Sequence, residues 1–196
     1  MEASTKTQEK QNNAAPKILI KITFTALFAA ITAAGAFIAI PIGPVPIVLQ
    51  NLFALLSGLI LGPVLGGAAV GLYLLAGILN LPVFAGGVGG LARFAGPTGG
   101  FLVGYLLMAI TAGLAAGRPR VNTGISLPRL IAAVAAGLLV VYVPGVLWLK
   151  VSRNLNWARA LMAGFVPFII GDILKGIAAV LISPRLRRLA ADHLDG

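Results

Sequence analysis

The chain has 196 residues, of which 59% are hydrophobic and 10% are charged, and its mean hydropathy is +0.99. Because a soluble domain carries about 25% charged residues, this composition indicates an integral membrane protein of one domain. The chain has no cysteine, which excludes disulfides and thiolate metal sites, and its single histidine, His193, excludes a histidine-built metal or catalytic centre. The net charge of +10 does not indicate nucleic-acid binding, since the basic residues flank apolar runs, where they reflect membrane topology and contact lipid headgroups.

The first half of the chain predicts a polar, disordered tail followed by three apolar spans. A helix rises 1.5 Å per residue, so about 20 residues cross the hydrocarbon core. The Pro-rich segment 41–46 cannot be a regular helix and is expected to form a short outer loop. Gly62-Pro63 predicts a tight turn between the second and third spans. The tail covers residues 1–16, and the spans cover residues 17–40, 47–61 and 64–79.

The second half predicts a glycine-rich loop and three further spans. Ser183-Pro184 is expected to end the last span, leaving a short basic tail over residues 184–196. The loop covers residues 80–100, and the spans cover residues 101–116, 130–149 and 157–182. The sequence therefore predicts an all-α membrane protein with a six-helix, substrate-binding domain over residues 17–183.

Six spans place both termini on one side of the membrane. We expect a multi-pass protein of the cell membrane with both termini in the cytoplasm. Ten basic residues then lie in the tails and in the basic loop 118–129, against three or four on the opposite side. In this orientation the Pro-rich and Gly-rich loops share the outer face, where they are predicted to cap a ligand cavity.

The most informative residue is Asp172, the one acidic residue between Glu9 and Asp192. A carboxylate facing lipid at the bilayer centre costs about 2.5–3.5 kcal/mol, so we expect it to face the bundle interior. Lys175, three positions later, falls on the same helical face. The pair could serve only as a structural ion pair, but a buried pair contributes little net stability, so we interpret it as part of a binding site.

The glycine-rich loop supplies further candidates. Its Gly-x-Gly-x-x-Ala pattern at 87–92 lacks the acidic partner of a dinucleotide site. Irregular backbone at membrane depth survives only where it is buried or lines a cavity, which favours Gly86 and Gly87 as ligand-facing positions. Arg93 matches an anion clamp or a snorkelling arginine. Asn80, like Gln50, could bind a ligand through its amide or could be a turn or terminal residue, whereas Tyr142 and the other aromatic residues are more consistent with packing.

Ala26, Ala30 and Ala34 form a stripe of small residues on the first span. Small residues four apart let a second helix approach closely in lipid. The stripe fits either internal packing or docking to another membrane protein.

Several motifs in a fixed order resemble the BioY family, the biotin-binding S components of energy-coupling factor (ECF) transporters. The resemblance extends over about residues 17–182. The motifs are ALFAA at 26–30, PIGPVPIVLQ at 41–50, LPVFAGG at 81–87, GPTGG at 96–100 and GDILK at 171–175.

This resemblance implies a subunit that binds biotin and joins a transmembrane coupling protein and two cytoplasmic ATPases, with no enzymatic activity, metal or cofactor of its own. It places ligand contacts at Asn80, Arg93, Asp172 and Lys175 and partner docking at Ala26, Ala30 and Ala34. Biotin offers a ureido group that suits Asp172 and Asn80 and a carboxylate that suits Arg93 or Lys175; the sequence does not say which cation takes the carboxylate.

Two alternatives remain. A solitary biotin carrier would work without the ATPase module, and the chain itself contains no Gly-x-x-x-x-Gly-Lys-Ser/Thr motif. A membrane enzyme acting on a lipid phosphate would be expected to hold a metal with two or more carboxylates, and the apolar region has only Asp172.

Overall fold

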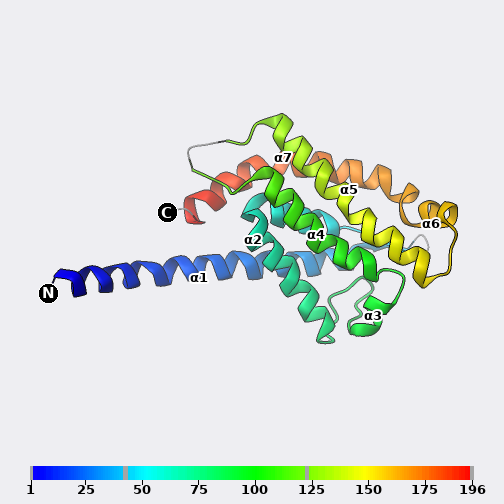
Figure 1. Ribbon diagram of the computed structural model, residues 1–196, viewed down its shortest axis with the longest axis horizontal. Helices are drawn as coiled ribbons and strands as arrows, with labels where there is room; N and C mark the ends of the chain where they lie inside the picture. The colour runs from blue at the N-terminus through cyan, green and yellow to red at the C-terminus, as the bar shows by residue number, and fades with distance from the viewer. Residues whose placement is uncertain (1, 42–43, 122–123, 195–196) are drawn as a thin grey trace.

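The computed structural model describes residues 2–41, 44–121 and 124–194. Within them the protein is almost entirely helical, and five helical stretches are long and apolar enough to cross a membrane. Figure 1 shows the elongated bundle, with the short elements gathered at one end and both chain termini toward the other. The elements in chain order are α1 (Glu2–Phe37), β1 (Ala39–Ile40), β2 (Ile47–Val48), α2 (Gln50–Ile78), α3 (Leu91–Ala95), α4 (Gly99–Ala116), α5 (Leu127–Ser152), α6 (Trp157–Gly164), η1 (Val166–Phe168) and α7 (Ile169–Leu194).

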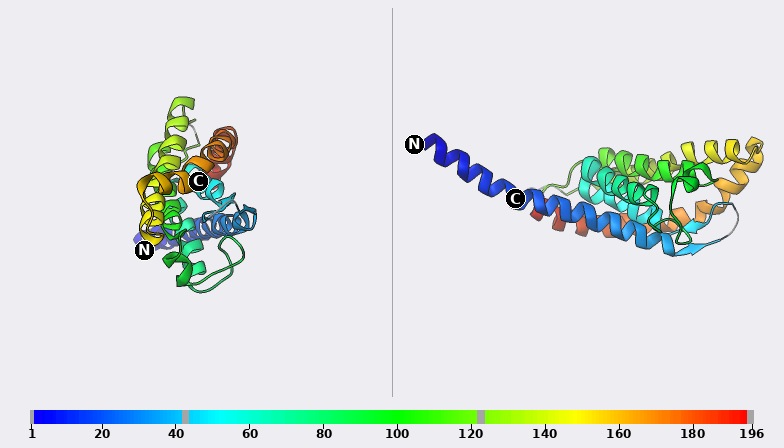
Figure 2. Two further views of the ribbon diagram at one scale, coloured as in Figure 1. Left: turned by 90° about the vertical axis from the view of Figure 1, so that its right-hand side faces the viewer. Right: turned by 90° about the horizontal axis from the view of Figure 1, so that it is seen from below.

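The first helix is longer than the sequence predicts. α1 begins at Glu2 and projects beyond the rest of the bundle (Figures 1 and 2), whereas a disordered tail is predicted for residues 1–16. Glu, Lys, Gln and Ala dominate residues 2–15, and all four favour the helix. After α1, the strands β1 and β2 pair antiparallel, Ala39 with Val48 and Ile40 with Ile47. The second span consequently begins at Gln50 rather than at residue 47.

Helix α2 folds back on itself at Gly62. This residue has φ 79° and ψ 179°, a conformation open only to glycine, and Pro63 follows it. The Ser57 hydroxyl donates to the Gly66 carbonyl at 3.2 Å, although nine residues span roughly 13 Å along a straight helix. The turn predicted at Gly62-Pro63 therefore reverses the chain within α2.

The prediction for the last span is wrong in two respects: the helix is interrupted, and it ends later than predicted. A single helix is predicted over 157–182, but α6 ends at Gly164 and α7 begins at Ile169. Pro167 lies in η1 between them, where it lacks an amide hydrogen and would clash with a preceding helical carbonyl. Nor does Pro184 end the helix, because α7 continues to Leu194 and packs its end on α1, where the rings of Phe24 and His193 are 6.1 Å apart.

The centre of the bundle is built from α2, α4 and α5, which approach closely through glycine. A Cβ at Gly58 would lie 2.0 Å from the Ala109 carbonyl oxygen, and one at Gly104 would lie 2.7 Å from that of Val141. Lipid offers no hydrophobic drive for helix association, so such close backbone packing supplies the contact instead. Large apolar side chains such as Leu139 and Leu181 remain exposed around the outside, as a lipid-facing surface requires.

Candidate functional site

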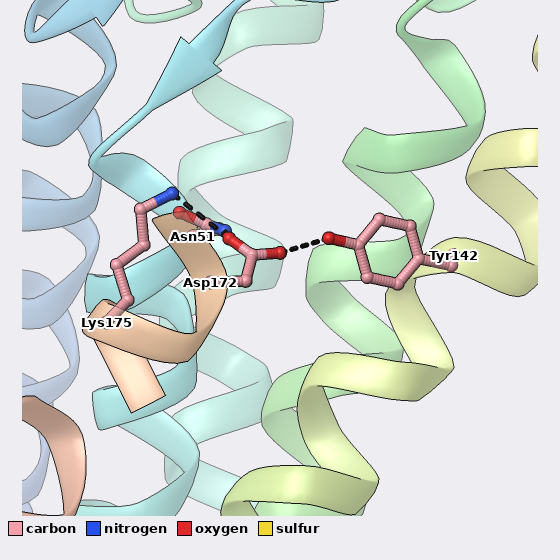
Figure 3. A network of polar contacts seen from close by, with 4 residues as sticks. All are labelled: Asn51, Tyr142, Asp172 and Lys175. Atoms are coloured by element: carbon pink, nitrogen blue, oxygen red, sulfur yellow. Dashed lines mark hydrogen bonds and ion pairs between the residues drawn. The ribbon is translucent and has the colours of Figure 1, made fainter. Parts of the chain in front are cut away.

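Asp172 lies in the first turn of α7 and faces the interior of the bundle, with only 6% of its surface exposed. Its Oδ1 accepts from Asn51 Nδ2 at 2.9 Å and from Lys175 Nζ at 3.2 Å. Its Oδ2 accepts from the Tyr142 hydroxyl. Figure 3 shows these side chains converging from α2, α5 and α7 on one carboxylate. We call these four residues the Asp172 cluster.

The Asp172 cluster contains the only ion pair in the described part of the chain, Lys175 with Asp172. Both side chains are about nine-tenths buried, at 11% and 8% exposure. Isolated buried charges are very costly, and here the carboxylate has three donors to compensate for lost water. The hydrogen bonds from Asn51 and Tyr142 therefore let an ion pair persist inside the apolar bundle.

Two small cavities open beside this cluster, each with room for about 20 Å³. The first lies against the Asp172 cluster. The second lies against Gln50, Arg93 and Thr98. They share a wall, formed by Val45, Pro46, Val48, Phe101 and Tyr105. Val45 and Pro46 thus lie between the Asp172 cluster on one side and Arg93 on the other.

Polar atoms without partners face the same region. Asn51 Oδ1 and Thr98 Oγ1 are buried and have no hydrogen-bond partner. A buried polar atom left unpaired costs about 1–3 kcal/mol. Asn51 lines the cavity at Asp172 and Thr98 lines the cavity at Arg93. Asn51 Oδ1 can accept a hydrogen bond from a polar ligand along the shared wall, and the Thr98 hydroxyl can accept or donate one.

Arg93 lies in the short helix α3, which the glycine-rich segment forms after Gly90. Its side chain is half-buried, and Nη2 donates to the Ala85 carbonyl at 3.3 Å. Phe84 anchors this glycine-rich segment, to which it belongs. Its side chain is fully buried and makes edge-to-face contacts with Tyr73 and Phe94, at ring-centroid separations of 5.5 and 5.8 Å. The anchored segment holds the arginine at the second cavity.

Three predicted site residues do not line either cavity. Asn80 is exposed, adopts φ 70° just after the end of α2 and donates its amide to the Gly77 carbonyl, as a helix-terminating residue does. Gly86 and Gly87 have φ of 86° and 67° and turn the chain beside Ala85. The structure therefore gives these three residues a role in shaping the loop, and brings Arg93, Asp172 and Lys175 to the cavities.

Sequence reasoning missed Asn51 and assigned Tyr142 to packing. Asn51 follows Gln50 at the start of an apolar helix, so a polar pair at membrane depth was a usable signal. No comparable signal marks Tyr142, because its role depends on how α5 packs against α7. The described residues contain no group of three His, Cys, Asp or Glu side chains that could hold a metal.

The predicted docking residues share one exposed face of α1. Ala26, Ala30 and Ala34 are exposed, while Ala29 and Ala36 are buried against the bundle. The stripe therefore does not pack within the protein, and a second helix could approach it.

Comparison with known proteins identifies the family of this chain. The model of the BioY family matches residues 5–192. The probable biotin transporter BioY of Pyrococcus horikoshii is 41% identical over 167 residues, covering 85% of this chain and 96% of that protein. The biotin transporter BioY of Thermotoga maritima is 40% identical over 167 residues, covering 85% and 95%.

A solved structure shares the fold. It is the crystal structure of the S-component for biotin from an ECF-type ABC transporter, with a TM-score of 0.75 and 33% identity over 86% of this chain and 90% of that one. Since the family model and the relatives span most of the chain, the protein belongs to the BioY family.

Proposed function

We propose that this protein binds biotin at the outer face of the cell membrane as the substrate-specific S component of an ECF transporter, and that it is not an enzyme. The names of its relatives and of its structural neighbour support the substrate. The observation that carries the proposal is the Asp172 cluster, which places a buried carboxylate beside one cavity while Arg93 lines its neighbour. Biotin has complementary ends, a ureido ring and a carboxylate.

The ureido ring belongs at the Asp172 cluster in this proposal. A carboxylate has about four lone-pair sites, and three of those on Asp172 are used by Asn51, Tyr142 and Lys175. One site on Oδ2 remains for a ureido N–H, and the unpaired Asn51 Oδ1 can accept the second. Lys175 can donate to the ureido carbonyl. A ligand that lacks these groups would leave buried polar atoms unpaired and would be rejected.

The carboxylate end belongs at Arg93. Guanidinium and carboxylate match as a two-pronged, charge-assisted pair, and the unpaired Thr98 hydroxyl lines the same cavity. The apolar ring and chain would lie along Val48, Phe101 and Tyr105. This choice assigns Arg93, rather than Lys175, to the carboxylate.

Binding requires the shared wall to move. A space of 20 Å³ holds about one water molecule, which is far less than biotin needs. Val45, Pro46 and Val48 separate the two cavities. We propose that these residues shift on binding and join the cavities into one.

The proposed membrane arrangement has six crossings and cytoplasmic termini. The two arms of α2, residues 50–61 and 63–78, would supply two crossings shorter than a full span, and α6 with α7 would supply the last. The exposed stripe of Ala26, Ala30 and Ala34 would then dock a transmembrane coupling protein, which links the subunit to two ATPases. A solitary biotin carrier remains the alternative, and uptake by vesicles lacking every ATPase subunit would favour it.

Equilibrium dialysis of detergent-purified protein against labelled biotin tests the proposal. We expect saturable binding of one biotin per chain without ATP, and competition by unlabelled biotin but not by a fatty acid of similar length. The fatty acid is the matched control, because it keeps the carboxylate and chain and lacks the ureido group. Absence of binding at micromolar biotin would refute the function.

A further inference from the structure

A larger polar cavity lies at the end of the bundle opposite the candidate site, near the C-terminus. It has a volume of about 410 Å³ and lies between the end of α4, the start of α5 and the C-terminal part of α7. Figure 1 shows these three segments together at the end away from α3 and α6. Its lining includes four arginines, Arg118, Arg120, Arg129 and Arg187. We call this the arginine pocket.

The arginines of this pocket have no acidic partners in the described residues, where the one ion pair is that of the Asp172 cluster. Arg187 is 7% exposed and donates to the carbonyls of Leu59, Ala116 and Gly117. Its guanidinium thereby satisfies carbonyl groups near the Gly62 turn of α2 and at the C-terminal end of α4. Arg129 donates Nε to the Ala115 carbonyl at 2.8 Å. The pocket therefore combines two arginines held by backbone carbonyls with two exposed ones, and none of the four pairs with a carboxylate of the described residues.

An apolar trough adjoins the arginine pocket and shares Arg118 with it. The trough has a volume of about 200 Å³. Its walls include Leu61, Val64 and Leu65 from the turn of α2, and Val64 is 64% exposed. Lys21 of α1 lies at the same trough. Cationic and apolar surfaces thus follow one another along the outside of the bundle.

We propose that the arginine pocket binds the phosphate headgroup of an anionic phospholipid whose acyl chain lies in the trough. Guanidinium groups match phosphate oxygens in geometry and charge, and basic pockets between helices on the cytoplasmic side suit anionic headgroups. An acidic protein segment would match the charge but would not need the exposed apolar trough. Assignment to the inner leaflet rests on the membrane orientation proposed above.

The test uses the full chain, purified in detergent and stripped of lipid. Native mass spectrometry is measured with phosphatidylglycerol and with phosphatidylcholine. We expect one retained phosphatidylglycerol per chain and little phosphatidylcholine. The double variant Arg118→Gln/Arg120→Gln should lower phosphatidylglycerol retention by at least about tenfold. This double variant keeps Arg187, whose hydrogen bonds to backbone carbonyls hold α2 and α4 together.

The matched control is Arg153→Gln/Arg159→Gln, which removes the same charge at exposed positions of the other end. It should retain lipid like the unmodified protein. Equal retention of both lipids, or equal loss in both double variants, would overturn the proposal. So would displacement of phosphatidylglycerol by millimolar inorganic phosphate, which would assign the pocket to a free anion.

A protein partner gives a different result. If lipid retention is unchanged in Arg118→Gln/Arg120→Gln but co-purification with cytoplasmic transporter subunits is lost, the pocket belongs to that partner and the lipid proposal is wrong. Biotin binding is measured on the same samples and should not change. Failure of biotin binding in the unmodified protein would refute the proposed function without altering the lipid result.

Discussion

A single carboxylate organises the candidate site, because Asp172 holds side chains from three helices. Asp172→Asn removes the charge that compensates Lys175, and breaking a buried pair on one side costs about 3–5 kcal/mol. We expect this variant to lose at least about tenfold in biotin affinity, since hydrogen bonds to charged groups contribute about 1.5–3 kcal/mol, and to unfold at a lower temperature. Dialysis with labelled biotin and thermal unfolding monitored by size-exclusion chromatography measure the two effects.

The double variant Asp172→Asn/Lys175→Gln separates binding from folding. Removing both charges leaves no uncompensated ion, so thermal stability should recover while biotin affinity stays low. If affinity also recovers, Asp172 is a structural residue and the proposed ureido contact is wrong.

Arg93 allows a sharper test, because its proposed partner is only one end of the ligand. Arg93→Gln should weaken biotin binding by about 10- to 100-fold, the value of a charged hydrogen bond of about 1.5–3 kcal/mol. It should leave the affinity for biotin amide, which has no carboxylate charge, nearly unchanged. Competition assays with both ligands on the variant and the unmodified protein give the comparison. An equal loss for both ligands would show that Arg93 supports the loop rather than the carboxylate.

At the scale of the element, the reversal of α2 depends on one backbone conformation. Gly62→Ala places a Cβ in a φ/ψ region that costs about 1–3 kcal/mol for residues other than glycine. The nearest atom would be 3.5 Å away, so the expected loss of thermal stability comes from the backbone and not from a clash. Gly71→Ala is the control in the same helix. It meets nothing within 4 Å and should be neutral or stabilising. Equal effects would contradict the requirement for glycine at the turn.

The elements also show which features can be predicted from the sequence. Gly62-Pro63 and the apolar runs are local signals, and so is a charge within an apolar stretch, as at Asp172 and Lys175. Pro167 is an equally local signal of a break, but the continuous hydropathy around it predicts a single helix. Tyr142 and Arg187 are different, because their partners lie 30 and 128 residues away along the chain and only the packed bundle brings them together.

At the scale of the whole molecule, the candidate binding end, with its two cavities, and the exposed flank of α1 do not overlap. Ala30 lies on the open face of α1, away from both cavities. Ala30→Trp adds a large ring where a partner helix needs close backbone approach. We therefore expect unchanged biotin binding and loss of assembly with the coupling protein, measured by co-purification from cells that express the complete transporter. Leu139→Trp is the control, because Leu139 is 63% exposed on α5 and should tolerate the same ring without loss of assembly. Retained assembly in Ala30→Trp would show that this face of α1 is not the docking surface. Loss of biotin binding would show that the flank and the candidate binding end are coupled within the isolated subunit.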